Sequence, residues 1–253
     1  MVIAMAGMLV PAATCAAFSW LKAASAGYKT YKAMSLSDED VVEYVKQGVK
    51  QMDRSNTVMS SSSPYTTRLN KLTAGFKKVN GIPLNFKVYK TNELNAFACA
   101  DGSVRVYSKL MDVMTDEELL GIIGHEIGHV GLHHSRKQIK RELLTGALRD
   151  AISSSDGRAG MLAQSSLGAM GEMMLNAKYS QSQEKEADDY GYNFLKRNGK
   201  NPMAMVRAFE KLKKMEGQTS GVSKYINKMF SSHPAMDERI SRIREKCRKD
   251  GYK

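Results

Sequence analysis

The chain is poor in the residues on which disulfide-built and fibrous proteins depend. Its 253 residues include three cysteines, five prolines and one tryptophan. Three cysteines are too few for a disulfide-built scaffold. Apolar residues make up 42% of the chain and charged residues 25%, which is typical of a globular protein. This composition excludes an intrinsically disordered chain and a collagen-like repeat.

Long hydrophobic runs are also missing. Beyond residue 27 no segment approaches 18 uninterrupted apolar residues, which excludes a polytopic membrane protein. Residues 1–21 carry no charge, and the Ala-Ser-Ala tripeptide at 24–26 matches a signal-peptidase cleavage pattern. We therefore expect a signal peptide or N-terminal anchor over 1–26, one domain over 27–253, and a periplasmic or cell-envelope location. Membrane association through the N-terminus stays open, because the Ala-Thr-Cys tripeptide at 13–15 matches a lipoprotein cleavage box poorly.

The chain has no concentrated basic patch outside its tail. Its 38 Lys and Arg against 26 Asp and Glu give a net charge of +12, but only residues 239–253 are dense in cations. No zinc-finger, RRM or KH pattern is present, so we expect a solvated basic surface and no nucleic-acid partner. Cys99 and Cys247 lack C-x-x-C spacing. They either pair in an oxidising compartment or are two free thiols.

Hydrophobic periodicity predicts an α+β fold that is mainly helical. Apolar spacing and capping signals predict helices over 37–53, 65–79, 115–134, 159–176, 184–196, 202–217 and 235–249. The helix from 115 has room to continue towards 144. Strands are predicted over 84–91 and 103–108, and residues 95–98 are expected to be extended. Asp101-Gly102 predicts a turn that makes the small sheet antiparallel where it links neighbouring strands.

The segment His125-Glu126-Ile127-Gly128-His129 carries the chemistry. Its two histidines are four residues apart, so on a helix they share a face. Both imidazoles can then reach one zinc ion at about 2.1 Å. Glu126 lies about 100° round the helix, where its carboxylate can take a proton from water at the metal. The pattern predicts hydrolysis of a peptide bond with Glu126 as general acid/base.

The surroundings of this motif indicate a buried helix. Thr115 and Glu118 form a capping-box pattern, and apolar residues occupy most faces of the helix that follows. Two solvated surface histidines are the alternative interpretation. It is disfavoured because buried imidazoles without partners are costly, and a metal removes that cost.

A catalytic zinc needs a third protein ligand and an open position. His133 is eight residues from His125, about 12 Å along a continuous helix, which is too far to share the ion. The metzincin spacing is absent as well, since residue 135 is serine. We expect His133 and His134 to be solvated near the end of the helix.

The segment Glu184-Lys185-Glu186-Ala187-Asp188 is a better candidate than His133 for the third zinc ligand. Glu184 and Asp188 share one helix face, whereas Glu186 points about 200° away from Glu184. One carboxylate can bind zinc, and the other can accept a hydrogen bond from a ligand histidine. Ala187 is small enough for two helices to approach closely. Taken alone, the segment also fits an ordinary acidic solvent face.

Together these residues resemble a known family. The sequence is similar to the CAAX-prenyl-protease and HtpX-type zinc peptidases, and in particular to their exported soluble branch of the LoiP and BepA type. The resemblance rests on His125-Glu126-x-x-His129, Tyr179-Ser180, Glu184-x-Glu186-Ala187-Asp188, Ser232-His233-Pro234 and Arg239-Ile240. It covers most of residues 36–245 and implies a zincin-like metallopeptidase with a small sheet whose edge borders the active-site cleft.

The resemblance also implies roles for individual residues. It makes His125, His129 and Glu184 the ligands of one zinc ion, Glu126 the general acid/base, and Asp188 the support of a ligand histidine. It places His233 near the metal, where it either stabilises the oxyanion or caps the zinc, with Arg239 supporting that region. The resemblance further implies that Asn95-Ala96-Phe97-Ala98 forms the sheet edge that binds substrate.

Two functions follow as hypotheses. The first is a zinc endopeptidase of the cell envelope that acts on unfolded or misassembled proteins. The second is a zinc-containing chaperone-like or binding module with a latent active site, because His233 as a fourth ligand closes the site as in structural zinc sites.

Overall fold

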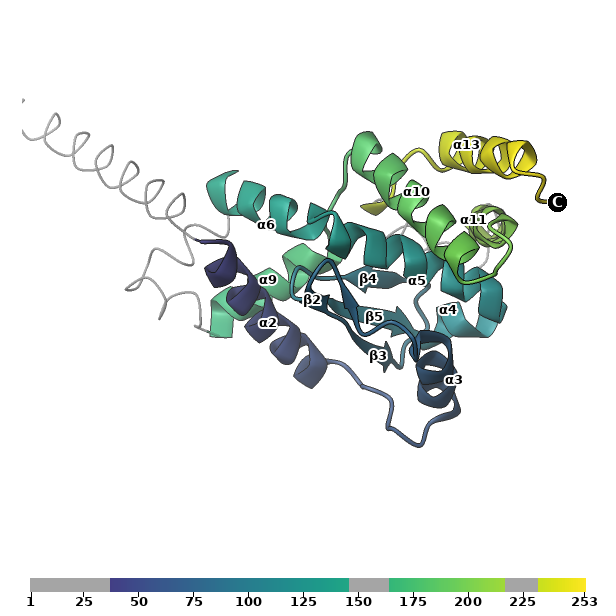
Figure 1. Cartoon of the computed structure of the whole chain (residues 1–253). Helices are drawn as coiled ribbons and strands as arrows, with labels where there is room; N and C mark the ends of the chain where they lie inside the picture. The colour runs from purple at the N-terminus through teal and green to yellow at the C-terminus, as the bar shows by residue number, and fades with distance from the viewer. Residues whose placement is uncertain (1–36, 146–163, 217–231) are drawn as a thin grey trace, which may run out of the picture.

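The computed structural model describes residues 37–145, 164–216 and 232–253 (Figure 1). The predicted signal segment 1–26 and the predicted helix end at residue 217 lie outside these residues. The helices are α2 (Asp38–Ser55), α3 (Pro64–Thr73), α4 (Ser108–Val113), α5 (Asp116–Gly131), α6 (His134–Thr145), α9 (Gln164–Leu175), α10 (Gln181–Arg197), α11 (Met203–Glu216) and α13 (Met236–Lys249). The strands are β1 (Lys78–Val79), β2 (Ile82–Pro83), β3 (Asn85–Tyr89), β4 (Ala96–Ala98) and β5 (Ser103–Tyr107). The predicted helix-rich α+β class is confirmed.

The main sheet has three strands in the order β3-β5-β4. β3 runs parallel to β5, and β4 runs antiparallel to it, as the Asp101-Gly102 turn predicts. Gly102 has φ +86°, and a Cβ on it would lie 1.9 Å from the carbonyl oxygen of Pro83, so only glycine fits there. β4 is left at the edge of the sheet.

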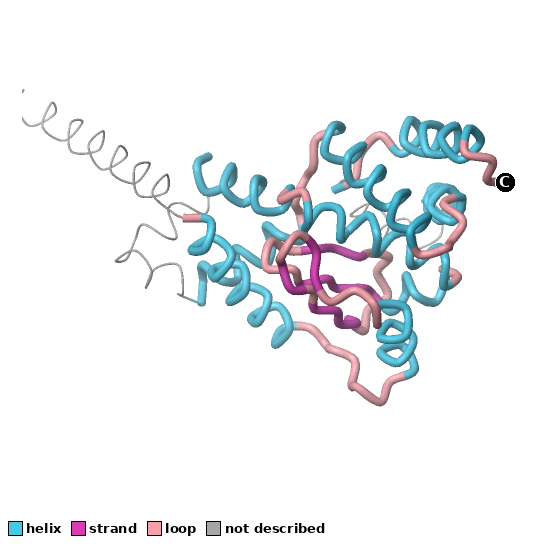
Figure 2. Tube along the Cα trace, in the orientation of Figure 1, coloured by secondary structure: helices cyan, strands magenta, loops and turns pink. Residues whose placement is uncertain are grey.

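The two faces of this sheet pack against different helices (Figure 2). Because strand residues alternate between faces, one face presents Val88, Ala96, Ala98, Val104 and Val106 to the core around α5. The other face presents Tyr89, Phe97, Cys99 and Tyr107 to a second core formed with α2 and α9. The sheet is therefore buried on both sides, which explains why every β5 residue is buried.

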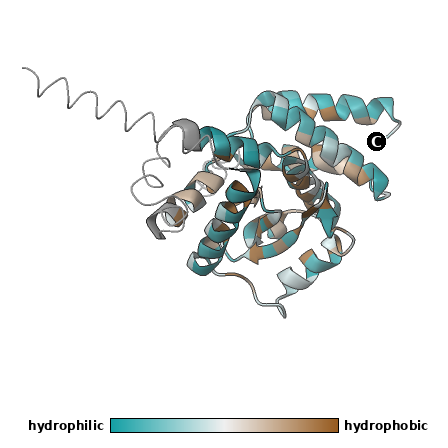
Figure 3. Cartoon of the chain, turned by 60° about the vertical axis from the view of Figure 1, so that its left-hand side comes forward, coloured by the Kyte–Doolittle hydropathy of each residue, from teal (hydrophilic) through white to brown (hydrophobic). Residues whose placement is uncertain are grey.

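Helix α5 is the central helix, and α10 and α11 pack on it. Fourteen of its residues are buried, from Glu118 to Gly131, so its apolar faces meet strands on one side and helices on the others. Hydrophobic residues gather around the strands and α5, whereas α6 and α13 are mostly hydrophilic (Figure 3). The predicted capping box of Thr115 and Glu118 is present. Among the described residues, no helix has the length and apolar composition that a membrane span requires.

Two predicted helix ends are wrong. The helix predicted over 65–79 ends at Thr73, and Asn80-Gly81 is the turn of the β1–β2 hairpin rather than a helix cap. Both turn residues have positive φ, 46° and 83°, which is the backbone of a tight hairpin. The helix predicted to reach His134 ends at Gly131, because His133 adopts φ +58° and α6 starts afresh.

The two cysteines of the described chain do not pair. Cys99 and Cys247 are free and buried, and they belong to different core clusters. Of the two alternatives that the sequence left open, separate free thiols are correct. Burial raises the pKa of the Cys99 thiol well above its ordinary value, which suits a packing role.

Candidate metal centre and active site

Helix α5 directs two imidazoles to one point. His125 and His129 are buried, and their Nε2 atoms lie 3.0 Å apart. Spacing of one helical turn produces this convergence, as the sequence pattern predicts. Each ring turns its Nδ1 atom away from that point.

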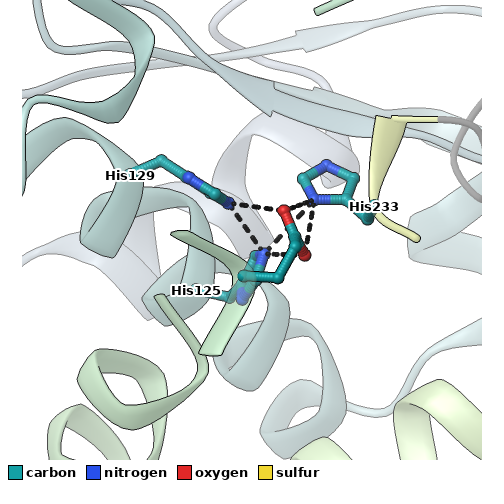
Figure 4. A group of neighbouring side chains, drawn as sticks. His125, His129 and His233 are labelled. Carbon is teal, nitrogen blue, oxygen red and sulfur yellow. Dashed lines mark hydrogen bonds and ion pairs between the residues drawn. The ribbon is translucent and has the colours of Figure 1, made fainter. Parts of the chain in front are cut away.

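Helix α10 brings a carboxylate to the same point. Glu184 is fully buried, with Oε1 3.3 Å from His129 Nε2 and Oε2 3.6 Å from His125 Nε2. His233 approaches from the segment before α13, with Nδ1 3.0 Å from Glu184 Oε1. The ligand atoms of these four residues all lie within 4.8 Å of one another, and the three labelled imidazoles face one carboxylate in Figure 4.

A buried ion pair between Asp188 and Arg239 contacts His125 and Glu184 on the side away from the point where the ligand atoms converge. The Nδ1 atom of His125 lies 3.0 Å from Asp188 Oδ1, one helical turn beyond Glu184. Arg239 of α13 donates from Nε and Nη2 to the Asp188 carboxylate at 2.9 and 2.7 Å, and its Nη1 lies 2.6 Å from Glu184 Oε2. The structure thus places Asp188 behind His125 and Arg239 behind both carboxylates.

The electrostatics suit cation binding. Burial acts to raise the pKa of Glu184, but His233, His129 and Arg239 outweigh it and hold that pKa far below its usual range. Burial also acts to raise the pKa of Asp188, but the hydrogen bonds and the charge of Arg239 lower that pKa to about 2. Burial lowers the pKa of His129 well below its ordinary value. The carboxylates are therefore ionised and His129 is neutral, the states in which these side chains bind metals.

Glu126 differs from Glu184. It is buried, and its Oε1 atom has no hydrogen-bond partner among the described residues. The nearest cation is His233, whose Nε2 lies 3.6 Å away. Burial raises the pKa of Glu126, and nearby His233 only partly opposes this. A carboxyl with a raised pKa and an unused oxygen is suited to accept and return a proton.

The predicted substrate edge borders this centre. A cavity of about 10 Å³ is lined by Asn95, Ala96, Phe97, Glu126, Tyr179 and His233, among others. Asn95 and the three β4 residues are buried here, and the Asn95 Oδ1 atom has no partner within the described chain. The structure therefore brings Asn95, Ala96 and Phe97 next to Glu126, whereas Ala98 lines a neighbouring pocket with Ser135 and Tyr179.

Sequence reasoning missed two residues of this centre. His134, predicted to be solvated, is 1% exposed and places its Nδ1 3.1 Å from His129 Nδ1. The expectation was wrong because the break at His133 turns His134 back onto α5. Tyr179 stacks on the His129 ring, with centroids 3.8 Å apart and planes 21° apart. The sequence resemblance included Tyr179-Ser180 but gave Tyr179 no role, and Ser180 proves to be the N-cap of α10.

The donor set fits a divalent metal ion. Two imidazole nitrogens and one carboxylate oxygen, all buried and charge-compensated, are the ligands of catalytic sites with three protein donors. Asp188 supplies the hydrogen-bond partner that such a ligand histidine requires. The Glu184 carboxylate contacts Arg239 and His233, and the Asp188 carboxylate contacts Arg239 and His125, so both acidic groups are held at the centre in the charged form that a cation requires.

Comparisons with known proteins agree with this geometry. The sequence profile of peptidase family M48 matches residues 66–247. The chain is 44% identical over 225 residues to metalloprotease YcaL of Escherichia coli (strain K12), covering 88% of this chain and 86% of YcaL. It is 43% identical over 231 residues to metalloprotease LoiP of the same organism, covering 90% and 89%.

A more distant relative is the beta-barrel assembly-enhancing protease of Yersinia pestis. It is 29% identical over 192 residues, which are 70% of this chain and 37% of that protein. With a family profile over most of its length and two relatives above 40% identity, the chain belongs to peptidase family M48 and is a metallopeptidase.

Proposed function

We propose that the chain is a zinc-dependent endopeptidase of the cell envelope that hydrolyses unfolded or misassembled proteins. One observation carries the proposal. Two imidazole Nε2 atoms and one carboxylate converge in a buried site, and a second carboxylate with an unused oxygen lies beside them. The uncharged residues 1–21 and the similarity to a beta-barrel assembly-enhancing protease support the envelope location.

His125, His129 and Glu184 hold one zinc ion in this proposal. The His₂Glu donor set is the one that several zinc peptidases use. Zinc, when bound, polarises the scissile carbonyl and lowers the pKa of water at the site. Asp188 accepts the Nδ1–H of His125 and so fixes which nitrogen faces the metal. Arg239 keeps the Glu184 and Asp188 carboxylates ionised and in place.

Glu126 moves the proton. Its free Oε1 atom accepts a proton from the attacking water, and the buried surroundings that raise its pKa allow it to hold that proton. The same carboxyl then donates the proton to the leaving amine. We assign to His233, whose Nε2 lies 3.6 Å from Glu126 Oε1, the role of stabilising the developing oxyanion.

The register of β4 explains why the substrate would be unfolded. Asn95 accepts a hydrogen bond from the Tyr107 amide, and the Cys99 amide donates to Ser103, so the odd-numbered residues bond to β5. Backbone groups of Ala96 and Ala98 therefore point to the outer edge. The Ala98 carbonyl is already used by Ser135 Oγ at 3.1 Å. An extended substrate would pair with Ala96 and the Ala98 amide, a mode that requires an unfolded chain.

A second function is supported by His233. Its Nδ1 atom lies 3.4 Å from His125 Nε2 and 3.0 Å from Glu184 Oε1, the place of a fourth ligand. A closed site of this kind suits a zinc-containing chaperone-like module with a latent centre. Replacing His233 with alanine distinguishes the two: higher casein cleavage indicates a cap, lower cleavage a catalytic role, and no cleavage in either form the module.

Glu126→Gln tests the proposed hydrolysis. We expect the variant to retain one zinc per chain and to lose about 10²- to 10⁴-fold in casein cleavage, because glutamine cannot take the proton. Zinc content and cleavage are measured on the same samples, with and without a chelator. Glu117→Gln, a change at a half-buried side chain in the first turn of the same helix, is the matched control and should cleave like the wild type. Equal cleavage by Glu126→Gln would refute the assignment.

A further inference from the structure

The Nδ1 atoms of the two candidate ligand histidines have different hydrogen-bond partners. His125 uses a carboxylate directly, since its Nδ1 lies 3.0 Å from Asp188. His129 uses a second imidazole: its Nδ1 lies 3.1 Å from the Nδ1 atom of His134. His134 in turn places Nε2 3.2 Å from the Oε2 atom of Glu186. A chain of hydrogen bonds thus leads from His129 to the protein surface.

The backbone is arranged so that this chain can form. α5 ends at Gly131, and His133 adopts φ +58°, a left-handed conformation that is uncommon outside glycine and that asparagine, aspartate and histidine take more often than other residues. This break starts α6 at His134 and returns that side chain to the His129 ring. Glu186 comes from α10, two residues after Glu184, and its Oε1 atom accepts a hydrogen bond from Ser182 at 3.1 Å.

Only one placement of protons satisfies all three groups. A neutral imidazole has one N–H donor and one acceptor nitrogen. When His129 turns a bare Nε2 towards a cation, its proton is on Nδ1 and is donated to His134. The Nδ1 atom of His134 is then the acceptor, and its own proton is on Nε2, facing the Glu186 carboxylate. The surface carboxylate therefore sets the tautomer of a buried ring two hydrogen bonds away.

We propose that His134 and Glu186 form a hydrogen-bond relay that positions His129 for metal binding. The inference rests on the proposed role of His129 as a zinc ligand and deepens it. Both relay members are positioning residues, because they act on the metal through His129 and do not reach the other ligands. His134 is buried and the Glu186 side chain is 53% exposed, so the relay joins the metal centre to solvent.

Zinc retention measures the relay directly. We expect His134→Leu to release zinc to a chelator about 10- to 100-fold faster than the wild type, the usual cost of losing a group behind a ligand. His134→Asn keeps an acceptor near the Nδ1 position and should recover part of that loss. Glu186→Ala should accelerate release less than His134→Leu, and Glu186→Gln, which keeps an acceptor oxygen, should be milder still.

A double variant identifies the route. If Glu186 acts through His134, adding Glu186→Ala to His134→Leu should not accelerate zinc release further. His133→Asn is the matched control, because asparagine tolerates the positive φ of residue 133 and should keep the backbone that places His134. It should release zinc at the wild-type rate. Thermal unfolding of the zinc-free proteins shows which variants keep the fold, and Glu186→Ala, at an exposed position, keeps the test available if His134→Leu does not fold.

The outcomes separate this inference from the proposed function. A wild-type chain that binds no zinc refutes the proposed ligands. A wild-type chain that holds one zinc, with release unchanged in both His134→Leu and Glu186→Ala, overturns the relay alone. Faster release in His134→Leu only would remove Glu186 from the relay, and equal release by His134→Leu and His134→Asn would contradict hydrogen bonding as the cause.

Discussion

Asp53 shows how single residues neutralise charge inside this protein. It lies on α2 and accepts hydrogen bonds from Arg105 at 2.9 and 3.1 Å, from Lys87 at 2.8 Å and from Tyr89 at 2.7 Å. The Arg105 side chain is only 2% exposed, so its charge depends on this one carboxylate. Asp53 thereby anchors α2 to β3 and β5, on the sheet face away from α5.

Asp53→Asn should destabilise the fold in a pH-dependent way. Burial acts to raise the pKa of Asp53, but hydrogen bonds from Arg105 and Lys87 lower that pKa in the folded chain. A carboxyl with a lowered folded pKa stabilises the protein above its unfolded value of about 3.9 and loses that effect as the pH falls through the folded value. We expect a loss of about 3 kcal/mol at pH 7, because Arg105 is left buried and unpaired.

Urea unfolding at pH 7, 5 and 3 checks this expectation. The difference between wild type and Asp53→Asn should be constant from pH 7 to 5 and should shrink below about pH 4. Asp112→Asn, an exposed change on α4, should cost no more than about 0.5 kcal/mol. A difference that grew on acidification would show that Asp53 stabilises the fold by another route.

Residue spacing predicts part of the centre and misses the rest for a physical reason. The pairs His125/His129 and Glu184/Asp188 follow from helix geometry, which operates within five residues. The contacts of His134 depend on the left-handed backbone of His133, which no periodic pattern indicates. The Asp53–Arg105 pair joins residues 52 apart, and a sequence gives no sign that such charges are buried together.

At the scale of elements, close packing of α5 against α10 sets the distance between the ligands. A Cβ on Gly128 would lie 2.9 Å from Tyr190 Cβ and 3.2 Å from the Cα atom of Ala187. The prediction that Ala187 permits close approach is confirmed by this contact. Small residues on both helices therefore allow Glu184 to reach His129 at 3.3 Å.

Gly128→Val should separate the two helices and weaken metal binding. The added atoms meet backbone on α10, which cannot rotate away, so we expect a loss of about 1–3 kcal/mol in stability. Zinc affinity should fall as well, since α5 and α10 carry different ligands. Gly168→Ala on α9 is the control: nothing lies within 4 Å of its added Cβ, and alanine should stabilise that helix by about 0.5–1 kcal/mol.

Both quantities are measured by denaturant unfolding of the zinc-free proteins and by zinc titration. Unchanged zinc affinity in a destabilised Gly128→Val chain would show that the helix spacing does not control the metal centre.

Element boundaries are harder to predict from sequence than this contact, because one short sequence signal can fit two different local structures. Asn80-Gly81 suits both a helix end and a hairpin, and only the pairing of Val79 with Ile82 decides between them.

At the scale of the whole molecule, the centre joins segments that are far apart in sequence. α5 supplies His125 and His129, α10 supplies Glu184, and the segment before α13 supplies His233. The sequence and its family resemblance predicted the mainly helical class, the place of the β4 edge and the meeting of α5 with α10. The second core between α2, α9 and the outer sheet face could not be predicted from sequence, because its members show no mutual signal before the chain folds.

A metal that bridges these segments should stabilise the entire chain. Zinc at about 1,000 times its dissociation constant contributes about 4 kcal/mol. For a chain of this size that raises the melting temperature by roughly 10 °C. Arg239 shares the charge of Glu184 and Asp188 within the protein itself, so the zinc-free chain should still unfold cooperatively, at a lower temperature.

Calorimetry with added zinc and with a chelator measures this shift. Glu126→Gln should show the full wild-type shift, because Glu126 is not a ligand, whereas Glu184→Gln should show little. Equal shifts in these two variants would place the metal elsewhere. A wild-type melting temperature that is insensitive to zinc would mean that α5 and α10 are held together by their packing alone, and that the centre contributes to chemistry without contributing to stability.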